Sequence, residues 1–219
     1  MASIGDTGIW SGDVLLSSRG IWTATVVPFD DSALSEGQAV TITVGTLSLV
    51  GTILRGSVLP EGAGFFVLGG AGKWRKGVAR KSYQDDKGVK LADVLRDLVS
   101  EAGERHTLAA ALGSTVLGRH WVRPEGSGVA SLNALGQPWR VRPDGVTEVG
   151  PMVYTASEGL FSVRSYAAAS RTALLEVPDE DVAELVPGKT LDMGGTSLQV
   201  DVTRIILGGG TVRVEVTGL

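Results

Sequence analysis

A glycine-rich segment ending in lysine, residues 69–73 (Gly-Gly-Ala-Gly-Lys), follows an apolar run and is the first candidate for chemistry. Loops of this composition bind phosphate when they have the pattern G-x-x-x-x-G-K-[ST], because backbone N–H groups hold the phosphates and the hydroxyl binds Mg²⁺. Here Val67 occupies the position of the first glycine and Trp74 that of the hydroxyl residue. The pattern is incomplete, so we predict a flexible loop and no nucleotide site.

The residues that hold metals or act as nucleophiles are few. The chain has no cysteine, and its two histidines, His106 and His120, lack the spacing of a zinc motif. An acidic cluster follows Pro178 and admits two interpretations, a cation site or the first turn of a helix, where the helix dipole favours acids. A glycosidase needs a pair of carboxylates across a cleft, and the sequence singles out no such pair. We therefore expect no catalytic residue, no cofactor and no metal site. The cluster consists of Asp179, Glu180, Asp181 and Glu184.

A basic segment interleaved with aromatic residues follows the glycine-rich loop. Basic residues that alternate with aromatic ones bind nucleic acid in some proteins, whereas Arg and Trp are also common at subunit interfaces. The net charge of −4 gives no broad positive footprint. We therefore favour a solvated loop or a subunit contact. We expect Trp74, Arg75 and Tyr83 to form that contact, with Trp74 and Tyr83 exposed in a lone subunit. The basic residues are Lys73, Arg75, Lys76, Arg80 and Lys81.

The two ends of the chain repeat each other at a spacing of about 150 residues. Val27-Pro28 and Val177-Pro178 each end an apolar run, and an acidic loop, a glycine and a further apolar run follow in both copies. This spacing is too long for a solenoid repeat and indicates a duplicated β-module. Shared turn chemistry in two unrelated β-segments is the alternative.

The segments between these frames read as short strands around one helix. Val40 to Val44 alternates apolar residues with Thr, which is typical of a half-buried strand. Residues 91–102 carry an apolar stripe at helical spacing, and Gly103 follows where a glycine ends helices. Residues 143–145 (Pro-Asp-Gly) form a turn signal between two β-runs. The stripe consists of Leu91, Val94, Leu95, Leu98 and Val99, and we expect it to pack against a barrel.

Length and composition bound the class of protein. A chain of 219 residues forms one large domain or two small ones, and 31 glycines with abundant Val and Thr indicate many tight turns between short strands. The N-terminus shows no signal-peptide pattern, and the most apolar stretch, residues 108–117, is far shorter than a membrane span. We expect no membrane anchor.

The predicted fold class is mainly β with an α+β insert, with two similar small β-barrels in tandem. The predicted domains are a first barrel (1–75), an insert with one amphipathic helix and a hairpin (76–150) and a second barrel (151–219).

The middle of the chain resembles a known family. Residues 69–74, 79–83, 88–98 and 101–104, followed by 132–145, resemble segments of the baseplate hub and tail-tip proteins of tailed bacteriophages. The resemblance implies two similar β-barrels joined by α/β inserts and assembled as a homotrimer, whose pseudo-sixfold ring matches a hexameric tail tube. One departure is that residues 130–136 are too short for the helix expected before Trp139.

The resemblance implies a structural virion component without catalysis, made in the host cytoplasm and located in the tail. Its partners would be a tail tube or distal tail protein on one side and a spike or fibre-tip protein on the other, and DNA would pass through the channel without specific binding. Two alternatives remain open: a tail-associated cell-wall hydrolase, which needs a cleft with perturbed carboxylates, and a stand-alone ligand-binding β-module.

Overall fold

The computed structural model describes residues 2–30, 34–59, 62–208 and 210–219. It is mainly β, and twelve of its strands belong to one large sheet. Among the helices of the described residues, none has the length and apolar character that crossing a membrane requires. The strands of the large sheet are β1 Ala2–Ile4, β2 Thr7–Ser17, β3 Thr23–Pro28, β4 Ala39–Val44, β5 Leu47–Leu59, β6 Gly62–Gly69, β14 Thr155–Ala156, β15 Ser162–Ala167, β16 Thr172–Glu176, β17 Lys189–Asp192, β18 Ser197–Gly208 and β19 Thr211–Gly218.

The first six strands close into a barrel. Their pairing follows the circle β1–β4–β5–β6–β3–β2, and β2 returns to β1, with every pair antiparallel. Alternate residues of each strand point inward, because successive side chains of a strand lie on opposite faces. The buried interior is aliphatic and aromatic, and it includes Ile4, Val14, Val26, Ile42, Leu49, Ile53, Phe65 and Val67.

The last six strands repeat this pairing order without closing. β15 pairs with β16, β16 with β19, β19 with β18, β18 with β17 and β17 with β14, which matches β2, β3, β6, β5, β4 and β1 in turn. The described residues show no pairing between β14 and β15, so the expectation of two barrels in tandem is not confirmed for the second set. Leu175 has the same place in the pairing of β16 that Val26 has in the pairing of β3. The two Val-Pro pairs therefore end equivalent strands, but they are offset by one residue.

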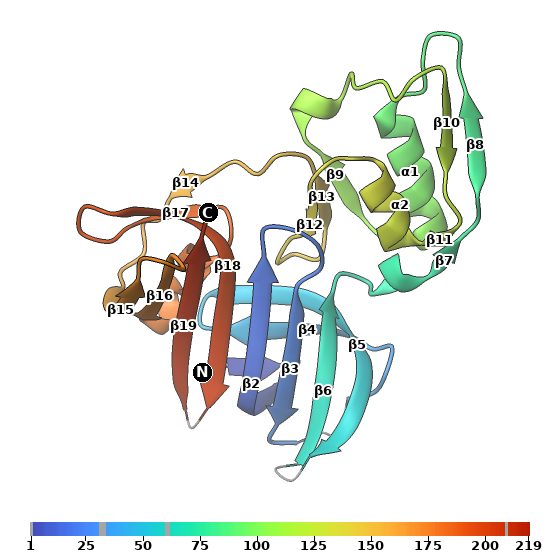
Figure 1. Ribbon diagram of the computed structural model, residues 1–219. Helices are drawn as coiled ribbons and strands as arrows, with labels where there is room; N and C mark the ends of the chain where they lie inside the picture. The colour runs from blue at the N-terminus through green and yellow to red at the C-terminus, as the bar shows by residue number, and fades with distance from the viewer. Residues whose placement is uncertain (1, 31–33, 60–61, 209) are drawn as a thin grey trace.

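A long antiparallel ladder joins the two sets. β2 pairs with β18 from Ser11↔Gly208 to Ser17↔Val202, so the strands form one row in the order β5–β6–β3–β2–β18–β19–β16–β15. Figure 1 shows this row across the front of the molecule, with β15 at one end and β5 at the other.

The remaining elements lie between residues 73 and 149, above the barrel in Figure 1. There are three small sheets: β10 pairs with β8, β11 pairs with β7, and β13 pairs with both β12 and β9. The predicted hairpin around Pro143-Asp144-Gly145 is confirmed as β12 and β13. The elements are η1 (a 3-10 helix) Lys73–Arg75, β7 Gly77–Val78, β8 Lys81–Gln84, α1 Leu91–Ala102, β9 His106–Leu108, η2 Ala110–Leu112, β10 His120–Arg123, β11 Gly126–Ser127, α2 Gly128–Ala134, β12 Trp139–Val141 and β13 Thr147–Val149; a further 3-10 helix, η3 Asp179–Leu185, belongs to the second set of strands.

The predicted helix is confirmed at both ends, since α1 spans Leu91–Ala102 and Gly103 ends it with a φ of 77°. All five residues of its apolar stripe are buried. The stripe serves the core of the insert, because α1 packs on α2 and β7; the expectation that it packs against a barrel is wrong. The expectation of no helix within residues 130–136 is also wrong. The short helix α2 begins earlier, where the Ser127 hydroxyl accepts a hydrogen bond from the Ala130 N–H.

Replacing Leu95 by alanine tests the packing of this helix. Leu95 is fully buried, so we expect Leu95→Ala to lower the free energy of unfolding by about 3 kcal/mol, through lost burial and the cavity left behind. Urea unfolding followed by circular dichroism measures the effect. Arg96→Ala is the matched control, because Arg96 is exposed one position along the helix and should change stability by less than about 0.5 kcal/mol. Equal effects of the two changes would contradict the buried stripe.

Candidate assembly interface

Trp74 lies inside the protein, so the expectation that it is exposed is wrong. Its side chain is fully buried, and its indole Nε1 donates a hydrogen bond of 2.7 Å to the Thr147 hydroxyl on β13. The ring packs against the first residue of α2, Gly128, where a Cβ would lie 2.8 Å from it. Trp74 therefore ties the glycine-rich loop to the hairpin and to α2.

The glycine-rich loop binds a carboxylate of its own chain. The N–H groups of Ala71 and Lys73 donate to the two carboxylate oxygens of Glu104, at 3.1 and 2.6 Å. Gly70 and Gly72 make this possible, because both have φ near 70°, a conformation that costs glycine little. Glu104 therefore occupies two backbone N–H donors of this loop that could otherwise bind an external anion. Nothing in the sequence pattern marks Glu104.

The other two residues expected at the contact have different surroundings. Arg75 is exposed. Tyr83 is half-buried on β8, where its hydroxyl donates to Asp97 at 2.5 Å and its ring lies 5.8 Å from that of Trp121. Burial, followed by the bond to Asp97, raises the pKa of the Tyr83 hydroxyl well above its ordinary value. A role of Arg75 and Tyr83 in a subunit contact stays a prediction.

A buried arginine missed in the sequence organises this side of the insert. Arg123 is 1% exposed; it donates to the Ala79 carbonyl and forms ion pairs with Glu101 and Asp97. The alternation of side chains along β10 could have indicated its burial, because Arg123 lies on the same face of the strand as Trp121. The Ala79 amide and then the Arg123 guanidinium hold the pKa of Glu101 below its usual value. Burial opposes ionisation of Asp97, but bonds from Lys81 and Tyr83 outweigh it and lower its pKa.

These lowered pKa values predict a loss of stability in acid. A carboxyl group whose pKa is lower in the folded state stabilises the protein above its unfolded pKa, about 4, and this contribution disappears as the pH falls through the folded value. We expect the melting temperature to fall between about pH 5 and pH 2 and the fall to be smaller in Glu101→Gln, which has no charge to lose. Thermal melts of both proteins across this range measure it. An equal fall in the two proteins would contradict a contribution from Glu101.

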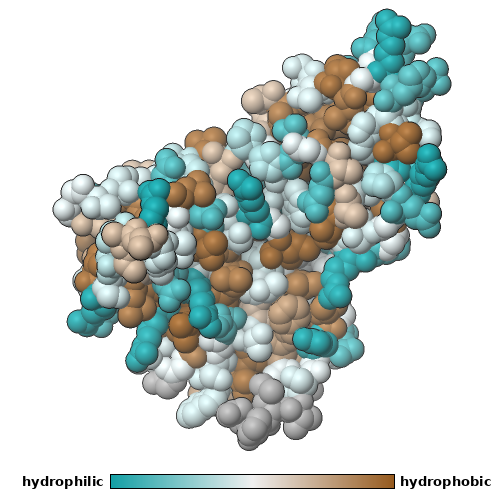
Figure 2. All heavy atoms as spheres, viewed as in Figure 1, coloured by the Kyte–Doolittle hydropathy of each residue, from teal (hydrophilic) through white to brown (hydrophobic). Residues whose placement is uncertain are grey.

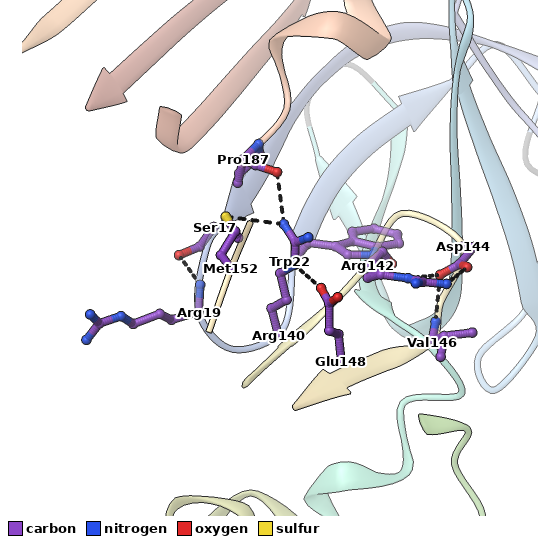
Figure 3. Close-up of polar contacts among 10 residues, drawn as sticks. All are labelled: Ser17, Arg19, Trp22, Arg140, Arg142, Asp144, Val146, Glu148, Met152 and Pro187. Carbon is purple, nitrogen blue, oxygen red and sulfur yellow. Dashed lines mark hydrogen bonds and ion pairs between the residues drawn. The ribbon is translucent and has the colours of Figure 1, made fainter. Parts of the chain in front are cut away.

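Arg140 on β12 joins the insert to both sets of strands. Figure 3 shows its guanidinium between Glu148 and Pro187: Nε donates to the Glu148 carboxylate at 2.8 Å and Nη1 to the Pro187 carbonyl at 2.9 Å. On the barrel side, the Gly20 N–H donates to the Trp139 carbonyl at 2.8 Å, and the Val141 N–H donates to Gly20 at 2.7 Å. The hairpin thus holds the barrel and the second set together where they meet.

The acidic cluster forms a second contact between the two sets. It lies in η3, and the carbonyl groups of Asp179 and Glu180 accept hydrogen bonds from the backbone and the hydroxyl of Thr46, at 3.1 and 2.8 Å. Glu184 is held by Lys189 at 2.7 Å. Gly45 permits this close approach, because a Cβ there would lie 1.7 Å from the Asp179 oxygen. These contacts favour turn chemistry over a cation site.

Two clefts beside the β12–β13 hairpin lack a carboxylate pair. One of about 740 Å³ is lined by residues 19–21, 129, 133 and 136–139, none of them Asp, Glu or His. Another of about 230 Å³ contains a single carboxylate, Glu148, which is paired with Arg140. Within the described ranges, no three His, Asp or Glu side chains converge to hold a metal.

The outer face of the strand row is mixed in polarity. Figure 2 shows apolar and polar groups side by side on this face. Two of its arginines are paired with carboxylates: Arg204 binds Asp13 through two nitrogens, and Arg164 pairs with Glu176. The guanidinium of Arg55 lies over the Phe66 ring, 5.5 Å from its centre. One line of cross-strand neighbours on this face runs Arg55, Phe66, Thr25, Asp13, Ile206 and Arg213.

Comparisons with known proteins identify the fold. No family model matches the chain, and no curated protein matches its sequence. Among solved structures, the 43 kDa tail protein of prophage MuSo2 from Shewanella oneidensis superposes with a TM-score of 0.69 at 8% identity, covering 100% of this chain and 96% of that one. A type VI secretion component of Escherichia coli, described as structurally similar to the T4 bacteriophage tail proteins gp27 and gp5, gives 0.67 at 9% identity over 100% and 76%. A tail protein of Neisseria meningitidis gives 0.64 at 12% identity over 99% and 95%. Along its whole length, this chain therefore has the fold of bacteriophage tail proteins, as the resemblance in its sequence implied.

Proposed function

We propose that the protein is a structural component of a phage tail or a tail-like particle, a hub that joins the tail tube to the spike or tip as a trimeric ring. The observation that carries the proposal is the repeated pairing order of the two sets of strands, joined edge to edge through β2 and β18. A subunit with two similar modules presents six similar surfaces when three copies surround an axis. Six surfaces match a sixfold tube.

The mixed outer face of the row supports a channel through which DNA passes. Bound DNA is held mainly by unpaired Lys and Arg that contact its phosphates. Arg204 and Arg164 on this face are instead paired with carboxylates. A channel lined by this face would therefore hold DNA less strongly than its number of arginines suggests, which favours passage without specific binding.

The proposed role is non-catalytic, and the protein acts in the tail of the particle after synthesis in the host. Tail proteins with this fold support the assembly role, and the two clefts described above lack the carboxylate pair that a cell-wall hydrolase needs.

Imaging of the assembled ring tests the proposal. We expect electron microscopy of the concentrated protein, or of particles that contain it, to show a ring of three subunits with six similar modules around a channel. The mass of the assembly, measured by light scattering, should be three times that of the 22.7 kDa chain. A ring with any other number of subunits, or a chain that stays monomeric in the particle, would overturn the proposal.

A further inference from the structure

The cleft of about 740 Å³ lies where the insert meets the barrel. One wall is the turn between β2 and β3, and the other comes from α2 and the loop before β12. Gly20 and Gly136 line opposite walls, and a Cβ built on either would meet no atom within 4 Å. The backbone of both walls is therefore open to a bound molecule. The apolar part of the lining consists of Ile21, Val129, Pro138 and Trp139.

Arg19 carries the only charge that lines this cleft. Its backbone N–H donates to the Ser17 hydroxyl, but within the described ranges its guanidinium has no hydrogen bond and no ion pair. Figure 3 shows the Arg19 side chain pointing away from Arg140 and Glu148, which pair with each other at 2.8 Å. The charge of Arg19 is thus available to a ligand.

Two side-chain amides add further donors. Asn133 accepts a hydrogen bond of 2.8 Å through Oδ1 from Trp139 Nε1, which leaves its two Nδ2 hydrogens to donate. In the part of the chain that the structure describes, Gln137 makes no hydrogen bond through its side chain or its backbone. The backbone groups of Ile21, on the opposite wall, also have no partner there.

These groups define the chemistry of a ligand. A guanidinium with neighbouring amide donors suits a carboxylate, because charge-assisted hydrogen bonds are stronger than neutral ones. The apolar wall suits an aliphatic or aromatic side chain, and free backbone groups on both walls can pair with an extended main chain. An open cleft between two structural units is also a common place for binding. The combination matches a peptide segment in which an apolar residue stands next to Asp or Glu.

We propose that this cleft docks an extended segment of another protein of the particle, in which an apolar side chain neighbours an aspartate or a glutamate. The proposal rests on the assembly role proposed above and states the chemistry of one partner. The carboxylate of the segment pairs with Arg19, and Asn133 and Gln137 donate to it or to the main chain beside it. The apolar side chain lies against Val129 and Trp139.

Selection from a library of short random peptides tests the chemistry of the occupant. We expect wild-type protein to enrich peptides with an apolar residue next to an acidic one, and Arg19→Gln to lose the preference for the acid. The matched control is Arg119→Gln, which removes the same charge from an exposed residue just before β10 that does not line the cleft. This control should enrich the same peptides as wild type.

The affinity of the most enriched peptide, measured by fluorescence anisotropy, gives the size of the effect. Arg19→Gln should weaken binding about tenfold or more, because a hydrogen bond between charged groups is lost. Arg19→Lys should restore part of the affinity, because it retains the charge. Asn133→Asp should also weaken binding, because the new carboxylate still accepts from Trp139 but repels the peptide. Melting temperatures equal to that of wild type show that a loss of binding is not a loss of folding.

Asn133 also reports where the peptide binds, because it is the only asparagine of the chain. After asparagine-selective ¹⁵N labelling, its side-chain amide gives one pair of NMR signals. We expect these signals to move when the peptide is added and to move less with a peptide in which the acid is replaced by its amide. N-acetylleucine, a carboxylate with an apolar side chain but no peptide chain, should compete far more weakly than the peptide.

The outcomes separate this docking cleft from the proposed function. Failure to enrich any peptide, equal binding by Arg19→Gln and wild type, or binding that leaves the Asn133 signals unchanged would overturn the docking cleft. Competition by N-acetylleucine as strong as that of the peptide would mean that the site takes small carboxylates, and would also overturn it. A three-subunit ring without peptide binding would leave the hub standing. Peptide binding by a protein that forms no such ring would support the cleft and overturn the hub.

Discussion

Trp74→Ala should lower the free energy of unfolding by about 3–5 kcal/mol, because it removes a large, fully buried aromatic side chain. The loss has three parts: the burial of the ring, the cavity beside Gly128, and the hydrogen bond to Thr147, whose hydroxyl is itself fully buried. Urea unfolding of the monomeric protein measures it. Trp74→Phe should cost less, about 1–3 kcal/mol, because it retains a ring but leaves the Thr147 hydroxyl without its partner.

Trp10→Ala is the matched control for Trp74, because the Trp10 side chain is 49% exposed on β2 and its removal should cost less than about 1 kcal/mol. The comparison also separates the two roles considered for Trp74. A residue of the core weakens folding when it is removed, whereas an interface residue weakens self-association and leaves the monomer intact. If Trp74→Ala kept its stability and lost only its assembly, the buried position of the side chain would be contradicted.

Gly45→Val should also be strongly destabilising, by about 3–6 kcal/mol. Gly45 has a φ of 57°, which a β-branched residue tolerates poorly, and its Cβ would lie 1.7 Å from the Asp179 carbonyl oxygen. The new side chain therefore combines backbone strain with overpacking that pushes η3 away from the β4–β5 turn. Thermal and urea unfolding measure the loss, and amide exchange at Thr46 should accelerate because its hydrogen bond to Asp179 is broken.

The pseudo-repeat supplies a control for Gly45. Gly195 lies in the matching turn before β18 and also has a positive φ, 102°, but nothing lies within 4 Å of a Cβ built there. Gly195→Val should therefore show the backbone strain without the collision, and cost about 1–3 kcal/mol. Equal losses at the two positions would mean that the contact between η3 and the β4–β5 turn adds nothing to stability.

The sequence predicted correctly the elements that are specified by residues close together in the chain. Helix α1 was predicted to the residue because its stripe and Gly103 lie within one stretch of thirteen residues. The β12–β13 hairpin was predicted from Pro143-Asp144-Gly145 for the same reason. Helix α2 was missed because its seven residues are too few to show a helical period, and its clearest start signal is the single hydroxyl of Ser127.

The features that depend on distant partners were not predicted. The burial of Trp74 depends on Thr147, 73 residues away, and its basic neighbours gave the opposite impression. The ladder between β2 and β18 joins strands almost 190 residues apart, and no local pattern specifies which edge a strand uses. The repeated Val-Pro pairs identified the equivalent strands β3 and β16. Aligning the two prolines is wrong by one residue, because the pairing with neighbouring strands determines which residues are equivalent.

The ladder between β2 and β18 also orders events during synthesis of the chain. All strands of the closed barrel lie within the first 69 residues, so the barrel has every partner it needs early in translation. The outer edge of β2, however, has no partner until β18 is made, and β18 begins only at Ser197. Contacts so distant in sequence form late in folding. A nascent chain that stops short of β18 leaves the β2 edge unpaired and has no row that extends from β5 to β15. The row that extends from β5 to β15 is therefore complete only after β18 and β19 have been synthesised.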